Sequence, residues 1–343
     1  ISIDKKYKSI IFTQLIHEYT TMQQNILSNA GPFSRLIFSV FVILVSFFIF
    51  LIIGVLFALP FWGIDIINFQ PLSDTTDLAN IAKMKYLQSI FAIGIFVAPP
   101  FVISWLITKN WSRYFMMQKV RNWDLLLLGC IMMITALPVI NFLGEINASM
   151  QFPDFLKGFE QQLKIAEQNA QLITETFLNV NSFGGLLVNL FIMAVIPAIG
   201  EEFLFRGVLQ RIFVEWTKNV HWGIIITSII FSGFHFQFYG FLPRMLLGVL
   251  LGYLMVYGKS IWFPVFAHFA NNAFAVIMSF IYRDSMKLEN VEQFGSYEGT
   301  YIFAIIGAVL FSLLFLYFVR NAGKNSLSIY KNIVLKKPVN EHS

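Results

Sequence analysis

Residues 37–61 read IFSVFVILVSFFIFLIIGVLFALPF, a run of 25 residues without a charged side chain. A helix needs about 20 apolar residues to cross the hydrocarbon core of a bilayer, so this run predicts a transmembrane helix. The whole chain of 343 residues agrees, with 57% hydrophobic and 13% charged residues. In soluble domains, about 45–50% of the residues are hydrophobic and about 25% are charged. The sequence therefore predicts an all-α polytopic membrane protein.

About eight apolar runs are long enough to cross a membrane. They cover 37–61, 88–108, 124–144, 183–206, 222–240, 242–258, 261–281 and 301–319. Prolines at 99, 100 and 138 are expected to break or kink the second and third helices. No internal repeat is evident, so the inverted repeats of many transporters are not expected.

Lysine and arginine gather in alternate connections between these runs, which is the pattern of cytoplasmic segments. We therefore expect a multi-pass protein of the cell inner (plasma) membrane with both termini in the cytoplasm. The 24 Lys and Arg against 19 Asp and Glu give a net charge of +5, without a basic stripe or nucleic-acid-binding motif. The lipid bilayer is the expected partner, and nucleic acid is not.

The chain is expected to divide into five segments: an amphipathic cytoplasmic N-terminal segment (1–36), three transmembrane helices (37–144), an external amphipathic segment (145–182), a transmembrane core (183–281), and an outer loop, last transmembrane helix and basic cytoplasmic tail (282–343). In the external segment, Phe152, Phe155, Phe159 and Leu163 recur at helical spacing between charged residues. We expect this extra helix to pack against the outer face of the bundle. A lone cysteine, Cys130, excludes an internal disulfide and cysteine-rich metal sites.

Ionisable and amide side chains inside apolar runs concentrate in the second half of the chain. An ionisable group there costs about 2.5–3.5 kcal/mol on insertion scales, so it calls for a structural or functional reason. The fourth run carries Glu201, Glu202 and Arg206, the fifth carries His235, and the seventh carries His268 and Asn272. The centres of the first three runs and the eighth carry none. This asymmetry indicates a functional site within 183–281.

Spacing predicts how these groups face one another. Glu202 and Arg206 are four residues apart, in the order that favours an ion pair on one helix face. Glu201 lies about 100° round the helix and is left without that partner. His268 and Asn272, also four apart, share one face of the seventh run.

Two kinds of hydrolytic chemistry suit this set. An unpaired Glu201 beside histidines in a wet cavity can take a proton from water, while His and Asn side chains donate hydrogen bonds to an oxyanion. Alternatively, Glu201, His235 and His268 form the two-histidine, one-carboxylate set of a catalytic zinc. The residues alone leave both open, so the cofactor is either none or Zn²⁺.

Three ordered motifs resemble the CPBP family, which comprises the CAAX-processing type II (Rce1-like) proteases, the bacteriocin-processing enzymes and the Abi proteins. The motifs are Glu-Glu-x-x-x-Arg at 201–206, Phe-x-x-x-His at 231–235 and His-x-x-x-Asn at 268–272. The resemblance covers about 185–280. It implies an eight-helix intramembrane endopeptidase, of glutamate or metallo type, with a cavity open to the cytoplasm and the membrane.

The resemblance also implies a role for each matching residue. Glu201 activates the water with the help of His235, and His268 and Asn272 form the oxyanion site. Glu202 and Arg206 stabilise the centre. The implied substrate is a membrane-associated peptide or protein, and whether it is prenylated stays open.

Two other classes of function also stay open. The ionisable groups could form the relay of a proton-coupled membrane transporter. The chain could also be a catalytically silent membrane scaffold or a bacteriocin-immunity protein. The lack of repeats and the complete motifs count against a transporter, and the intact motif residues count against a silent scaffold.

Overall fold

The computed structural model describes residues 25–72, 74–150, 152–282, 294–296, 299–323 and 325–335. Throughout these residues the ordered elements are helices, and no strand occurs among them. The predicted all-α polytopic class is confirmed. Most of the N-terminal amphipathic segment predicted at 1–36, most of the outer loop and the last basic residues lie outside the described residues.

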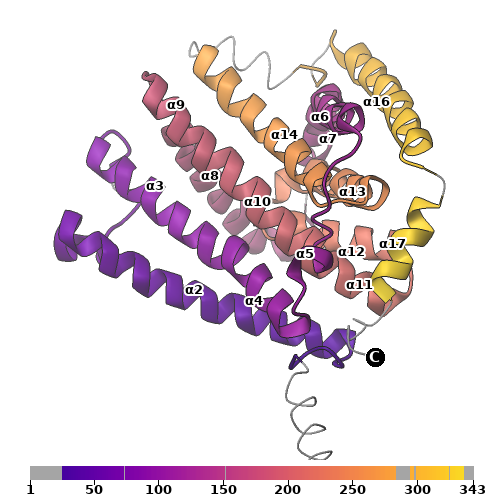
Figure 1. Cartoon of the computed structure of the whole chain (residues 1–343). Coiled ribbons are helices and arrows are strands. Elements are labelled where there is room, and N and C mark those ends of the chain that lie inside the picture. Colours follow the sequence, from indigo (N-terminus) through magenta and orange to yellow (C-terminus); the bar gives the residue numbers. More distant parts are fainter. Residues whose placement is uncertain are drawn as a thin grey trace, which may run out of the picture.

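The first helices form one side of the molecule (Figure 1). Helix α2, Pro32–Trp62, packs against α3, Leu78–Ala92, and α4, Ala98–Ile107. The Asp77 carboxylate caps α3 by accepting hydrogen bonds from two backbone N–H groups of its first turn. A single π-helical turn, Ile93–Val97, joins α3 to α4 just before the two prolines, so this span is irregular where the prolines predicted a break.

The third predicted span is two helices joined at a bend. Helix α6, Trp123–Thr135, and α7, Leu137–Ala148, meet at an angle of 41°. Pro138 supplies no N–H to the preceding turn and its ring clashes with that turn, which accounts for the predicted kink.

The segment 145–182, predicted to be external, contains the amphipathic helix that the sequence predicted. Helix α8 covers Lys157–Leu178 and follows a short 3₁₀ turn, Asp154–Leu156. It lies behind α9 in Figure 1.

One long helical run passes through the middle of the molecule, from Phe183 to Thr217. It consists of α9 (Phe183–Leu190), a π-helical turn (Phe191–Val195), α10 (Ile196–Glu202), a second π-helical stretch (Phe203–Leu209) and α11 (Gln210–Thr217). It is followed by α12 (Val220–Gly233), α13 (Phe241–Gly258), α14 (Trp262–Ile281), α16 (Tyr301–Asn321) and α17 (Ser326–Leu335). Helix α14 packs against both α10 and α6.

The described helices give fewer full spans than the eight predicted. Six are long and apolar enough to cross a membrane, and the bent α6–α7 pair raises this to seven at most. Helix α12 has 14 residues, which is about 21 Å at 1.5 Å per residue. That is shorter than a hydrocarbon core of about 30 Å. The count of eight is therefore not confirmed.

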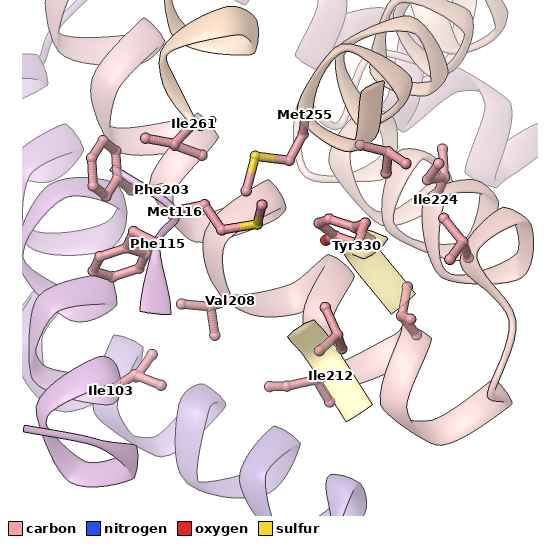
Figure 2. Packing of buried hydrophobic residues seen from close by; sticks show 14 of the residues in the cluster. Ile103, Phe115, Met116, Phe203, Val208, Ile212, Ile224, Met255, Ile261 and Tyr330 are labelled. Atoms are coloured by element: carbon pink, nitrogen blue, oxygen red, sulfur yellow. The ribbon is translucent and has the colours of Figure 1, made fainter. Parts of the chain in front are cut away.

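A buried apolar cluster surrounds the second half of the central run (Figure 2). Phe115 and Phe203 pack edge to face with ring centroids 4.9 Å apart. The C-terminal segment, predicted as a basic tail, also contributes: Tyr330 of α17 is fully buried, and its hydroxyl accepts a hydrogen bond from Gln210 Nε2 at 3.2 Å. This packing fixes the end of the helix that carries the Glu-Glu-x-x-x-Arg motif.

Gly200 lets the central helix approach the α3–α4 span. A Cβ at this position would lie 2.9 Å from side-chain atoms of Phe96 and Val97 and 3.1 Å from the Phe96 carbonyl carbon. We expect Gly200→Ala to lower the free energy of unfolding by about 1–3 kcal/mol, the usual cost of overpacking. Thermal unfolding in detergent, followed by tryptophan fluorescence, measures this.

Gly184→Ala is the matched control, because a Cβ at that helical position meets no atom within 4 Å. It is expected to be neutral or slightly stabilising. Equal effects of the two variants would contradict close packing at Gly200.

Candidate active site

The two adjacent glutamates of α10 have different surroundings. Glu202 is 0% exposed, and its Oε1 lies 2.8 Å from Arg206 Nη1 and 2.7 Å from His268 Nδ1. The predicted ion pair between Glu202 and Arg206 is therefore present. Glu201, one residue earlier, is turned away from it and lines a cavity.

Arg206 is held on three sides. Besides the bond to Glu202, its Nη2 donates to the carbonyl oxygen of Gly248 in α13 at 3.1 Å. Its guanidinium lies over the ring of Phe231, 4.7 Å from the centroid. The first residue of the Phe-x-x-x-His motif thus supports the arginine of the first motif. A buried charge needs such partners, because an unpaired one is strongly destabilising.

His268 connects the two glutamates. Its Nδ1 faces the Glu202 carboxylate, which can only accept, so Nδ1 carries a proton. Its Nε2 lies 3.9 Å from Glu201 Oε2. One water molecule within hydrogen-bond distance of both atoms can bridge that separation. Glu202 therefore fixes the ring so that its other nitrogen faces Glu201.

One oxygen of this cluster has no partner. Glu202 Oε2 is buried and makes no hydrogen bond within the part of the chain that the structure describes. Leaving a buried acceptor unpaired costs about 1–3 kcal/mol unless a water or ligand supplies a donor.

A cavity of about 450 Å³ joins the predicted residues. Glu201, His235, His268 and Asn272 all line it, as do Asn271 and Pro197. Its volume is within the usual range of ligand pockets, about 300–1,000 Å³. The structure thus brings residues from α10, α14 and the loop after α12 to one cavity.

Asn272 is tied to the break in the central helix. Pro197 has no N–H to give to the carbonyl oxygen of Met193 four residues earlier. Asn272 Nδ2 donates to that carbonyl at 3.1 Å. The second N–H of the Asn272 amide makes no hydrogen bond to any described residue. It can therefore donate to a ligand in the cavity.

His235 lies beyond the end of its helix, which corrects the predicted span 222–240. Helix α12 ends at Gly233, and Phe236 has a left-handed backbone with φ of 52°. Asn147 of α7, 1% exposed, holds the loop that follows. Its Nδ2 donates to the Phe238 carbonyl at 2.9 Å, and its Oδ1 accepts from the Leu242 N–H at 2.7 Å. These contacts hold the chain in a turn where a longer helix was predicted.

Helix α8 holds the same loop from the other side. Glu167 accepts a hydrogen bond from the Tyr239 N–H at 3.1 Å, and Glu160 accepts one from the Tyr239 hydroxyl at 3.0 Å. Lys164 lies 2.8 Å from Glu160. Hydrogen bonds from Lys164 and Tyr239 lower the pKa of the Glu160 carboxyl. Helix α8 is thus joined to the loop that bears His235.

Several cavity residues were missed by the sequence prediction. Arg244, near the start of α13, lines the cavity and donates to the backbone carbonyl and the side-chain oxygen of Gln237. It lies inside the predicted span 242–258, so the rule on ionisable groups in apolar runs could have found it. Ile173, Thr174 and Phe177 of α8 also line the cavity. No sequence signal separates these three from ordinary packing residues.

The zinc set predicted as an alternative does not assemble in this conformation. Within the described residues, no three His, Cys, Asp or Glu side chains lie close enough together to hold a metal ion. Glu201 and His268 lie near each other, but His235 does not join them as a third ligand.

The fold and site define a polytopic membrane protein with a buried glutamate–histidine centre, and comparisons with known proteins agree. Residues 183–274 match the family described as "Type II CAAX prenyl endopeptidase Rce1-like". The family resemblance drawn from the three motifs is therefore confirmed for this part of the chain. No solved structure matches the chain.

A curated relative carries a similar description. The chain is 29% identical over 136 residues to "Putative membrane peptidase YdiL" of Bacillus subtilis (strain 168). The alignment covers 40% of this chain and 51% of the relative, so the chain spans about half the length of that protein.

The first test of the site concerns its buried charges. We expect Arg206→Met to destabilise the protein by about 3–5 kcal/mol, because it leaves the Glu202 carboxylate buried without its cation. Adding Glu202→Gln to Arg206→Met should restore part of the loss. Arg320→Met, at the exposed end of α16, is the control. Thermal unfolding of the wild type and the three variants measures this. A double variant no more stable than Arg206→Met alone would contradict the ion-pair account.

The second test concerns the loop that bears His235. Asn147→Ala leaves the Phe238 carbonyl and the Leu242 N–H without their partner, so we expect a loss of about 1–3 kcal/mol of stability. Hydrogen–deuterium exchange should also be faster in residues 234–242. Asn321→Ala, which removes a bond within its own helix, should leave that loop unchanged. Unchanged exchange in Asn147→Ala would show that the loop is held by other contacts.

Proposed function

We propose that this protein is an intramembrane endopeptidase of the CPBP type that hydrolyses a peptide bond with water activated by Glu201. The observation that carries the proposal is the position of Glu201 in the cavity, 3.9 Å from a histidine nitrogen whose ring is fixed by a second, buried glutamate. The family match over 183–274 supports the same reaction class. Residues 183–281 are the proposed catalytic core.

The proposed reaction needs no covalent intermediate. The Glu201 carboxylate takes a proton from a water molecule, and the water oxygen forms a bond to the carbonyl carbon of the scissile peptide. We assign His235, on the loop that lines the same cavity, to help orient that water. The C–N bond then breaks, and the proton held by Glu201 passes to the leaving amine.

Negative charge develops on the carbonyl oxygen during this attack. The free N–H of Asn272 and the Nε2 of His268, when both ring nitrogens carry protons, are the proposed donors to it. Glu202 accepts the Nδ1 proton of His268 at the same time. Arg206 stabilises Glu202 and does not touch the substrate.

The proposed substrate is a membrane-associated peptide or protein, with or without a prenyl group. The proposed location is the plasma membrane, with both termini in the cytoplasm. The cofactor stays a prediction: a metal-free reaction is favoured by the side chains, because Asn272 suits an oxyanion better than zinc. A transporter or a silent scaffold would have the same fold without peptide cleavage.

The activity test uses purified protein in lipid vesicles and a set of quenched fluorogenic peptides, prenylated and unmodified. We expect Glu201→Gln to lower kcat by about 100- to 10,000-fold, the usual contribution of a general base. Glu145→Gln, at an exposed position of α7, should keep wild-type rates. A chelator should leave the wild-type rate unchanged.

The outcomes separate the alternatives. Cleavage by Glu201→Gln at the wild-type rate would falsify the assigned role of Glu201. Loss of cleavage under chelator with recovery on adding zinc would favour the metallopeptidase form. No cleavage of any peptide by the wild type would leave a transporter or scaffold as the better interpretation.

A further inference from the structure

A second hollow lies beside the catalytic cavity. It has a volume of about 590 Å³ and is formed between the α2–α3 connection and α8. Its lining residues are Phe69, Gln70, Pro71, Leu72, Asn169 and Ile173. We call it the α8 groove. It contains no ionisable side chain among these residues.

The α8 groove and the catalytic cavity share one side chain. Ile173 lines both, with Asn169 on the groove side and Phe177 on the cavity side. These three residues are spaced by four, so they form one stripe along α8. The stripe leads from the α8 groove to the cavity that contains Glu201.

Helix α8 is anchored at both ends of this stripe. Near its C-terminus, Lys85 Nζ donates to the Phe177 carbonyl at 3.1 Å and to Asn189 Oδ1 at 2.7 Å. Nearer its N-terminus, Glu160 and Glu167 bind Tyr239. The wall between the two hollows is therefore fixed to the helices around the catalytic cavity.

We propose that the α8 groove is a substrate-binding site that takes an extended, uncharged segment of the peptide next to the scissile bond. This inference rests on the proposed peptidase function. Apolar walls from Phe69, Leu72 and Ile173 suit apolar side chains, and the exposed Asn169 amide can pair with a peptide backbone. An unpaired positive charge in the groove would meet no counter-ion on its lining residues, and Lys83 Nζ already lies 5.5 Å from the centroid of the Phe69 ring. By the predicted topology, α8 and its groove lie on the outer side of the membrane. A peptide bound there would reach the catalytic cavity from that side and not from the cytoplasmic side that the family resemblance implied.

The test compares peptide lengths. A fluorogenic peptide that the wild type cleaves is prepared in a form of about 12 residues and in forms shortened from either end, because only the longer form can occupy both hollows. We expect Asn169→Trp, which fills the α8 groove and does not line the catalytic cavity, to raise KM for the long peptide about tenfold, equivalent to about 1.4 kcal/mol of binding. For the peptide shortened at the groove end, KM should stay within about twofold of wild type. For the long and the shortened peptide alike, kcat should also stay within about twofold.

Leu172→Trp is the matched control, because this neighbouring residue is exposed and lines neither hollow. A second variant avoids any folding defect. Asn169→Cys in a Cys130→Ala background is purified folded and then modified with a bulky maleimide. The modified protein should lose affinity for the long peptide only, and Leu172→Cys modified in the same way should not.

Each outcome bears on one proposal. Equal effects of Asn169→Trp and Leu172→Trp, or modified Asn169→Cys with unchanged KM, would overturn the groove assignment while Glu201-dependent cleavage stands. The same holds if KM rises equally for all peptide lengths, which would show that the substitution acts on the catalytic cavity and not on a separate binding site. A wild type that cleaves no peptide of any length would instead overturn the peptidase function itself.

Discussion

The need to neutralise one buried carboxylate organises the centre of this protein. Glu202 has no exposed surface, and a charge so placed survives only with close partners. Those partners come from different helices: Arg206 one turn later and His268 on α14. Arg206 in turn reaches the backbone of α13 at Gly248. Satisfying Glu202 therefore brings α10, α13 and α14 together, and leaves Glu201 facing the cavity they enclose.

Irregular helix geometry at the site follows from the same sequence. Pro197 removes a donor from the central helix, and π-helical turns flank α10 on both sides. Such turns are frequent at functional sites because they rotate side chains and free carbonyl groups. Here Asn272 uses the freed Met193 carbonyl to fix α14 against the central run. The proline is thus part of how the amide of Asn272 is positioned.

Local rules predicted the parts of the site that depend on one helix. The four-residue spacing predicted the ion pair between Glu202 and Arg206, and the apolar runs predicted the fold class. The position of His235 could not be predicted in this way, because its helix ends where Asn147, 88 residues earlier, binds the loop. The predicted bounds of the fifth span were wrong for the same reason: the apolar run 222–240 is one helix by its sequence pattern, but the loop contacts of Asn147 end the helix at Gly233.

The role of α8 shows why an amphipathic helix can line a membrane site. A wet cavity next to lipid needs a wall with one apolar face and one polar face. The charged residues Glu160 and Glu167 of α8 bind the loop that bears His235, while Ile173 and Phe177 line the cavity. A fully apolar helix could supply the packing but not the hydrogen bonds to Tyr239. The mixed composition that marks this segment as a surface helix in the sequence is therefore the property that lets it close the site.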